Sequence, residues 1–137
     1  MKTASIVLLA LANLGCFAFA LKLLLARGYF PYHSQVTGKT WEELAPGERV
    51  VIQALMRGYG SGNLGAALAG GWATWLLATG AEIPVLLTVL PGMIIGVVTL
   101  FLVTSLIRNG GTGAPRTQVA VLVAFGFAGL VLWPFAA

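Results

Sequence analysis

The chain has 137 residues, of which 58% are hydrophobic and only 9% are charged, and its mean hydropathy is +0.92. Because a soluble domain carries about 25% charged residues, this composition excludes an ordinary water-soluble globule and indicates that lipid solvates much of the surface. The net charge of +4 is spread over short loops and helix ends, which excludes a basic nucleic-acid-binding patch and indicates contact with lipid headgroups.

The first apolar segment covers residues 4–26 and is interrupted only by Asn13 and Lys22. At about 1.5 Å per residue it is long enough to cross a hydrocarbon core of ~30 Å. Residues 18–20 (Ala-Phe-Ala) resemble a signal-peptidase site and residues 14–16 (Leu-Gly-Cys) a lipoprotein box, but the apolar run continues past both and is too long for a signal-peptide core. We therefore expect this segment to be retained as a transmembrane helix.

Residues 27–46 form the one long polar connection. Thr40, followed by Trp41, Glu42 and Glu43, has the pattern of a helix N-cap with acidic residues in the first turn. Several aromatic residues in this stretch favour the headgroup layer. We expect an interfacial loop with a short helix that begins at Thr40.

Three further apolar segments predict helices over residues 47–78, 83–107 and 117–133. Pro46 is expected in the first turn of the second helix, where its missing N–H does no harm. Pro91 falls inside the third predicted helix, so a kink is expected there. Thr117 is expected to be the N-cap of the fourth helix. The predicted fold is all-α: residues 1–137 form a single transmembrane domain, an integral membrane four-helix bundle with a short interfacial helix in its first loop.

The positions of lysine and arginine predict the orientation. Loops one and three and their flanks carry five basic residues, whereas the opposite side carries Lys2. The five are Arg27, Lys39, Arg49, Arg108 and Arg116. By the positive-inside rule these loops are cytoplasmic and both termini lie outside, in a multi-pass protein of the inner (plasma) membrane.

Polar side chains gather at the start of the second predicted helix. Helical spacing of about 100° per residue places Gln53, Arg57 and Ser61 on one face. Three interpretations of Arg57 stay open: it reaches the headgroups, it forms a structural ion pair with an acid of loop one, or its planar guanidinium binds an anionic or polar ligand. The candidate ligand-binding site comprises six residues expected near one membrane depth: Arg57, Gln53, Ser61, His33, Trp41 and Glu42.

Small residues form two stripes at helical spacing. Gly58, Gly62 and Gly65, with neighbouring alanines, predict close helix packing against a stripe on the third helix that includes Gly92 and Gly96. Tyr59 points away from Arg57 at this spacing and is left out of the candidate site. Near the middle of the membrane, Asn13 and Asn63 are expected to bridge helices through their amides.

The sequence offers little catalytic chemistry. Cys16 is the only cysteine and His33 the only histidine, so neither an internal disulfide nor a Cys/His metal site can form. No Ser-His-Asp order, phosphate-binding loop or two-histidine haem motif is present, and we expect no catalytic residue, metal or cofactor. With an ordinary pKa near ~6.5, His33 is the natural proton carrier of any enzymatic alternative.

Short motifs in the first 65 residues carry a resemblance. They are Tyr-His at 32–33, Trp-Glu-Glu-Leu at 41–44 and Ala-Leu-Met-Arg at 54–57, followed by the glycine-rich 58–62. These motifs resemble small bacterial four-helix inner-membrane proteins of uncharacterised function, and the layout more loosely resembles DoxX-type membrane proteins. After residue 65 the similarity is one of hydropathy. The resemblance implies the architecture and a first loop that forms one unit with the start of the second helix.

The function expected from these features is non-enzymatic. The chain would be an accessory subunit, or a binder of a lipid or small apolar ligand through a polar site at the cytoplasmic interface. The alternative is a dimeric small transporter or channel, and a membrane enzyme that uses His33 is less favoured. The expected partners are membrane lipids and a second copy or a larger membrane complex, with no nucleic acid.

Overall fold

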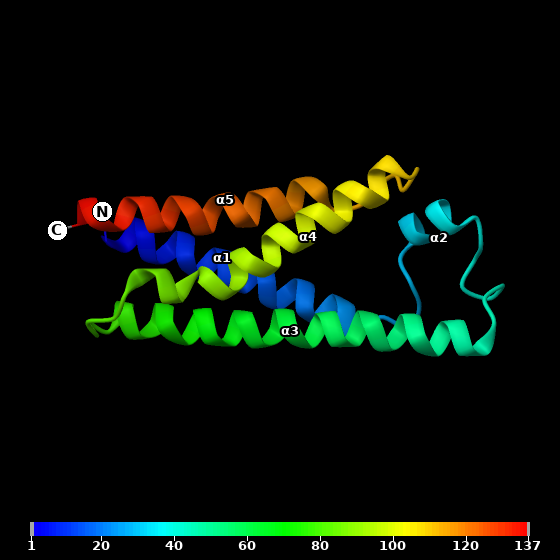
Figure 1. The fold of residues 1–137 in the computed structure, drawn as a ribbon. Helices are drawn as coiled ribbons and strands as arrows, with labels where there is room; N and C mark the ends of the chain where they lie inside the picture. Colours follow the sequence, from blue (N-terminus) through cyan, green and yellow to red (C-terminus); the bar gives the residue numbers. More distant parts are fainter. Residues whose placement is uncertain (1, 137) are drawn as a thin grey trace.

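The computed structural model describes residues 2–136, and over these residues it contains helices and no strands (Figure 1). The α-helices are α1 (Lys2–Leu24), α2 (Pro31–Thr37), α3 (Pro46–Ala78), α4 (Leu90–Arg108) and α5 (Arg116–Leu132). Two 3-10 turns complete the fold, η1 (Val85–Thr88) before α4 and η2 (Trp133–Ala136) after α5. The predicted all-α class is confirmed.

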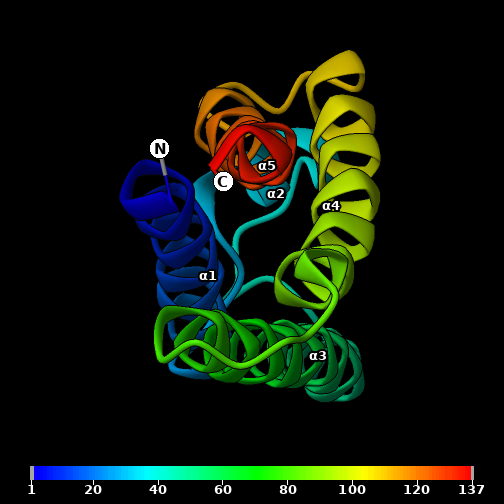
Figure 2. The ribbon, with the colours of Figure 1, turned by 90° about the vertical axis from the view of Figure 1, so that its left-hand side faces the viewer.

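The four long helices lie side by side around a common axis. α1 packs mainly against α3 and α5, and α4 packs against the other sides of the same two helices, so α1 and α4 face each other across the interior (Figure 2). Both ends of the described chain and the turn after α3 lie at one end of the molecule (Figure 1). α2, its flanking loops and the connection between α4 and α5 lie at the other end.

Two helices are long and apolar enough to cross a membrane, namely α1 and α4. α5 is also apolar but has 17 residues, and α3, with 33 residues, is about 50 Å long. The outside of the helices exposes large apolar side chains, such as Trp72 at 63% and Phe101 at 74%. An apolar surface of this kind indicates a membrane or protein contact rather than water.

The interior contains small and polar side chains beside apolar ones such as Leu9, Leu77 and Val103. Ser5, Asn13, Asn63, Thr74, Thr88 and Thr99 are buried, together with many alanines and glycines. These polar groups are hydrogen-bonded: the Ser5 hydroxyl donates to the carbonyl of Gly129 at 2.5 Å, for example. The buried polar groups are thus paired inside the bundle, and the small residues let the helices approach closely.

Asn13 confirms the expectation that an amide bridges helices. Its Nδ2 shares its two hydrogens among three acceptors, namely the carbonyl of Leu9 at 2.9 Å, Thr74 Oγ1 at 3.2 Å and the carbonyl of Thr88 at 3.1 Å. The side chain therefore connects α1 to α3 and to the end of η1.

The helix predicted over 83–107 begins later than expected, at Leu90. Pro91 therefore lies in the first turn of α4, where no N–H is needed, and the kink predicted there is absent. Residues 85–88 form η1 instead, after Pro84. The fourth helix begins one residue earlier than expected, at Arg116, with Pro115 rather than Thr117 as its N-cap. The first two long helices agree with their predicted ranges within two residues, and Pro46 opens α3 as predicted.

The short helix of the first loop forms earlier in the chain than predicted. α2 starts at Pro31 and ends at Thr37, and the C-cap residue Gly38 has a left-handed φ of 67°. The helix predicted to begin at Thr40 is absent: the residues after Thr40 form a turn, in which Glu43 Oε2 accepts from the Thr40 N–H at 2.6 Å. A helix cannot continue from there, since Ala45 precedes a proline and is extended, with ψ of 148°.

The predicted packing of the two glycine stripes against each other is wrong. Cβ atoms placed on Gly58, Gly62 and Gly65 would meet nothing within 4 Å, so these glycines lie on the outside of α3. The glycine of α3 that closely approaches α1 is Gly60, whose added Cβ would lie 3.0 Å from Leu23 Cβ. Gly96 packs on Val123 of α5 rather than on α3. Helical spacing identified the faces of each helix but not the neighbour of each face.

Candidate functional site

The long helices leave a cavity of about 310 Å³ between α1, α4 and α5 that also reaches Asn63 of α3. Its walls are mainly apolar, with Phe19, Met93 and Leu122 among the larger side chains. The volume lies at the lower end of the ~300–1,000 Å³ typical of small-molecule sites.

Small residues create this space. Ala12, Gly92 and Gly126 all line the cavity. A Cβ atom added at Gly126 would make ordinary contacts with Val89, Ala12 and Met93 at 3.6–3.9 Å, and one added at Gly92 would meet nothing within 4 Å. Larger side chains at these positions would fill the cavity. The cavity therefore exists because these positions hold alanine or glycine.

The polar groups on the α1 and α3 side of the cavity are already paired. Cys16 Sγ donates to the carbonyl of Asn63 at 3.4 Å, and Asn63 Nδ2 donates to the carbonyl of Tyr59 at 2.9 Å. The Tyr59 hydroxyl pairs with Thr99 Oγ1 of α4. These contacts connect the helices. Because the polar groups are already paired, the cavity walls offer a ligand mainly van der Waals contact.

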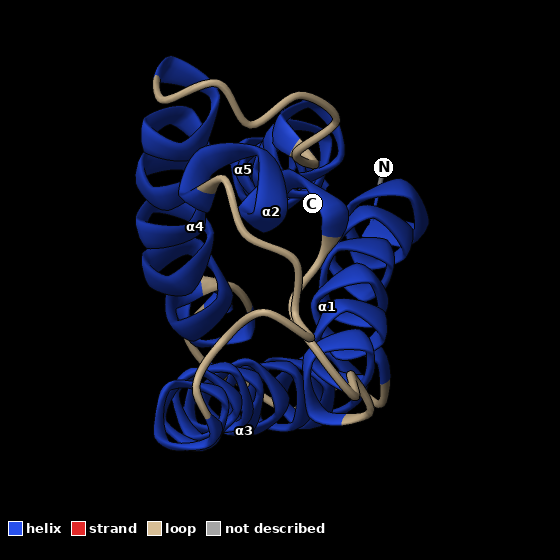
Figure 3. Cartoon of the chain, turned by 90° about the vertical axis from the view of Figure 1, so that its right-hand side faces the viewer, coloured by secondary structure: helices blue, strands red, loops and turns tan. Residues whose placement is uncertain are grey.

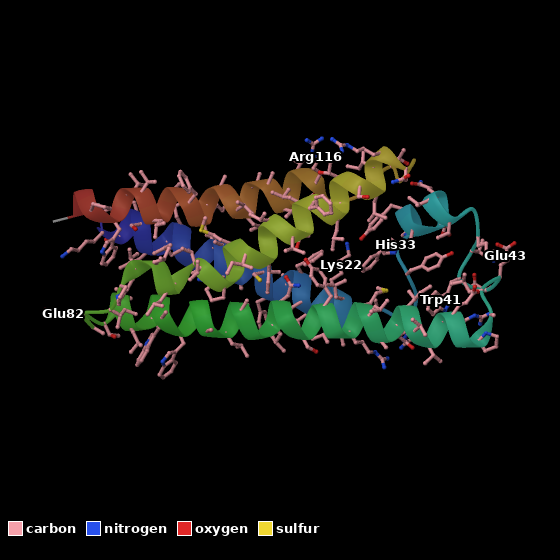
Figure 4. The ribbon with its side chains drawn as sticks, in the orientation of Figure 1. Lys22, His33, Trp41, Glu43, Glu82 and Arg116 are labelled. Carbon is pink, nitrogen blue, oxygen red and sulfur yellow. The ribbon has the colours of Figure 1, made fainter. Side chains whose placement is uncertain are left out.

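The charged end of the cavity faces α2. Lys22, in the last turn of α1, is the one charged residue among the described residues that line it, and Gln118 of α5 lines the same cavity. The ammonium group of Lys22 lies over the ring of Phe30, 4.8 Å from its centroid. Figure 4 places Lys22 beside His33, in the space between the end of α1 and α2.

α2 lies at this end of the helices, in front of α5 in the view of Figure 3. An aromatic cluster made of Tyr29, Phe30, Tyr32, His33 and Trp41 holds the loop together, with ring centroids 4.5–5.9 Å apart. The loop after α4 is tied to α2, because the Thr112 hydroxyl donates to Gln35 Oε1 at 3.0 Å. Burial raises the pKa of Tyr32 to about 12, so its hydroxyl stays protonated at neutral pH.

None of the six residues predicted as a ligand site is among the described residues that line the cavity. Arg57 and Ser61 are exposed on α3, where the Ser61 hydroxyl donates to the carbonyl of Arg57 at 2.9 Å, and Gln53 is half-buried. His33 and Trp41 are half-buried and both pack on Tyr29. Glu42 is exposed, and its carbonyl accepts from Arg49.

Two acids at this end of the molecule, Glu43 of loop one and Glu48 of α3, are engaged with nearby backbone groups. Glu43 Oε2 accepts from the Thr40 N–H at 2.6 Å, and Glu48 Oε2 accepts from the Ala45 N–H at 2.9 Å. The hydrogen bond from Thr40 lowers the pKa of Glu43, which keeps this carboxylate ionised. Ligand binding at Arg57 stays a prediction.

Lys22 and Gln118 are polar residues of the cavity lining that the candidate site predicted from the sequence did not include. Lys22 interrupts an otherwise apolar segment, and this is the signal that could have identified it. Gln118 follows directly after a loop and gives no comparable signal.

The cap of α2 is expected to depend on pH. His33 Nδ1 accepts from the Phe30 N–H at 3.1 Å, so Nδ1 carries no proton, and partial burial lowers the pKa of His33 below its ordinary value of 6.5. The folded state then binds fewer protons than the unfolded state, and the stability of the cap is lost as the pH falls through 6.5 toward the folded-state value.

Hydrogen exchange of the α2 amides should therefore be several-fold more protected at pH 7.5 than at pH 5.5, after correction for intrinsic rates. His33→Gln keeps an acceptor at the N3 position without a titrating group, and it should remove this pH dependence. Equal protection at both pH values in the wild type would contradict the assignment.

The sequence matches no protein-family model, and no curated protein or solved structure is significantly similar to it. The resemblance to DoxX-type proteins stays a prediction.

Proposed function

We propose that this chain is a multi-pass protein of the inner membrane, a four-helix bundle that binds a small apolar molecule in the cavity between α1, α4 and α5. The apolar outer face and the hydrogen bonds of the buried polar groups support a lipid environment. The cavity itself is the observation that carries the binding function.

The distribution of charge supports an orientation with α2 in the cytoplasm. Arg108 ends α4 and Arg116 begins α5, so both lie at the α2 end, where Lys39 and Arg49 are also found. Glu82 lies in the turn at the opposite end (Figure 4). Under the positive-inside rule, loops one and three face the cytoplasm and both termini lie outside. α3 is longer than a bilayer core, so its first turns would lie in the headgroup layer with loop one.

The size of the cavity sets the size of the ligand. At the ~30 Å³ that a water molecule occupies in the liquid, about 310 Å³ corresponds to roughly ten non-hydrogen atoms. Paired polar groups and apolar walls suit holding a molecule rather than transforming it, which places the protein among binding or accessory proteins.

Filling the cavity should abolish binding. Gly126→Leu adds four carbon atoms, or very roughly 120 Å³, to a wall where a Cβ atom meets only ordinary contacts. Native mass spectrometry of the full chain in lipid nanodiscs that contain 1-decanol should show at least tenfold less bound alcohol than for the wild type.

Ala124→Leu is the matched control, because Ala124 lies two residues earlier on α5 and is exposed. It should bind 1-decanol as the wild type does. Equal binding by the wild type and Gly126→Leu, or no binding by either, would contradict the proposal.

A dimeric transporter or channel is a second candidate. The exposed Gly58 and Gly62 leave space on the outside of α3 for a second copy to approach closely. A wild-type dimer in the same spectra that Gly62→Leu converts to a monomer would favour this function.

A further inference from the structure

We propose that the molecule bound in the cavity is a single-chain anionic amphiphile, whose acidic head lies at Lys22 and whose chain extends along α1 toward Asn13 and Gly126. This inference rests on the proposed function and adds the chemical class of the ligand.

The charge at the cavity argues for an anionic head. Lys22 is the one charged side chain among the described residues of the lining, so the wall itself contains no carboxylate to pair with it. An ammonium group has three N–H donors, and the ring of Phe30 covers one side of it at 4.8 Å. The remaining donors suit a carboxylate, sulfonate or phosphate oxygen, whereas a cationic head would be repelled.

Of the acids nearest in the sequence, Glu42 is exposed in loop one and is not among the described residues that line the cavity. The carboxylates of Glu43 and Glu48 accept from backbone N–H groups of loop one. The amide of Gln118, from the facing helix α5, lines the cavity and adds a neutral donor. The polar head therefore belongs at this end, beneath α2.

The rest of the cavity argues for a single chain of limited length. Asn13 and Lys22 are nine residues apart on α1, which corresponds to about 14 Å. Away from Lys22 and Gln118 the lining is mainly apolar and includes Val89, Asn13 and Gly126, and the Asn13 amide is hydrogen-bonded to the carbonyl of Thr88. A length of about 14 Å and room for roughly ten atoms match one chain of about ten carbons.

The experiment compares ligands that differ only in the head. Full-length protein in nanodiscs is given equal mole fractions of decanesulfonate, 1-decanol or decyltrimethylammonium, and bound ligand is counted by native mass spectrometry. Decanesulfonate should bind about tenfold better than 1-decanol, and the ammonium compound least.

Variants of Lys22 test where the acidic head of the ligand lies. Lys22→Gln should reduce binding of decanesulfonate to the level of 1-decanol without changing binding of the alcohol, and Lys22→Arg should retain the preference. Lys39→Gln, at an exposed lysine of loop one, should behave as the wild type. Gly126→Leu should abolish binding of both compounds.

The outcomes separate this inference from the proposed function. Equal binding of decanesulfonate and 1-decanol, or a preference that survives in Lys22→Gln, overturns the anionic head and leaves the cavity as an apolar site. Binding of neither compound overturns both. Decanoate and 1-decanoyl-lysophosphatidate then distinguish a free acid from a lysophospholipid as the source, and stronger binding of either one over 1-decanol supports the shared chemistry.

Discussion

Replacing Gly70 with alanine is expected to destabilise the fold by about 3 kcal/mol. Gly70 is buried on α3, and a Cβ atom there would overlap Asn13 Oδ1 and lie 2.5 Å from the carbonyl oxygen of Thr88. The Thr88 oxygen belongs to the backbone, so it cannot move away by a change of rotamer. Either α3 must separate from η1, or the hydrogen bonds of Asn13 must break. Reversible unfolding in mixed micelles would measure the change in free energy.

The next residue provides the control. A Cβ atom added at Gly71 would meet nothing within 4 Å, and a helical glycine is less stable than alanine by roughly 0.5–1 kcal/mol. Gly71→Ala should therefore be neutral or slightly stabilising, while the same change one residue earlier is strongly destabilising. Equal stability of the two variants would show that α3 and η1 do not approach each other as closely as described.

The sequence predicted the helical elements because hydropathy and proline act locally. Runs of apolar residues predicted the boundaries of three of the long helices to within two residues at each end, and Pro46 marked the start of α3. The start of α4 could not be predicted in the same way. Residues 83–89 are as apolar as the helix that follows, and only the position of Pro91 shows that the helix begins at Leu90.

The candidate site was harder to predict because it depends on which helices are neighbours. The 3.6-residue period of α3 shows that Gly58 and Gly62 share a face, but the packing of α1 and α4 decides that this face is outside and that Gly60 is inside. The cavity is likewise a property of three helices together. Lys22 is a visible irregularity in the sequence, yet its relation to Gln118 exists only once α1 and α5 have packed.

Replacing Asn13 with alanine is expected to destabilise the fold by about 2 kcal/mol. The amide of Asn13 donates to Thr74 Oγ1 and to the carbonyl of Thr88, and both acceptors are buried. Hydrogen bonds between transmembrane helices contribute about 0.6 kcal/mol on average, and a buried carbonyl left without a donor costs about 1–3 kcal/mol more. The same unfolding measurement applies.

Asn109→Ala is the matched control, because the amide of Asn109 is exposed and donates to the carbonyl of Ser105 at 2.8 Å. It should change stability by less than about 0.5 kcal/mol. Combining Asn13→Ala with Thr74→Val should give a coupling energy of about 0.5–1 kcal/mol, since the two side chains share a hydrogen bond of 3.2 Å. If the effects of Asn13→Ala and Thr74→Val on the free energy of unfolding are additive, and if Asn13→Ala destabilises no more than Asn109→Ala, the amide does not bridge α1 and α3.

Binding of decanesulfonate gives an independent readout. Because Lys22 lies nine residues away from Asn13 on α1, the Asn13→Ala variant should still bind decanesulfonate in preference to 1-decanol.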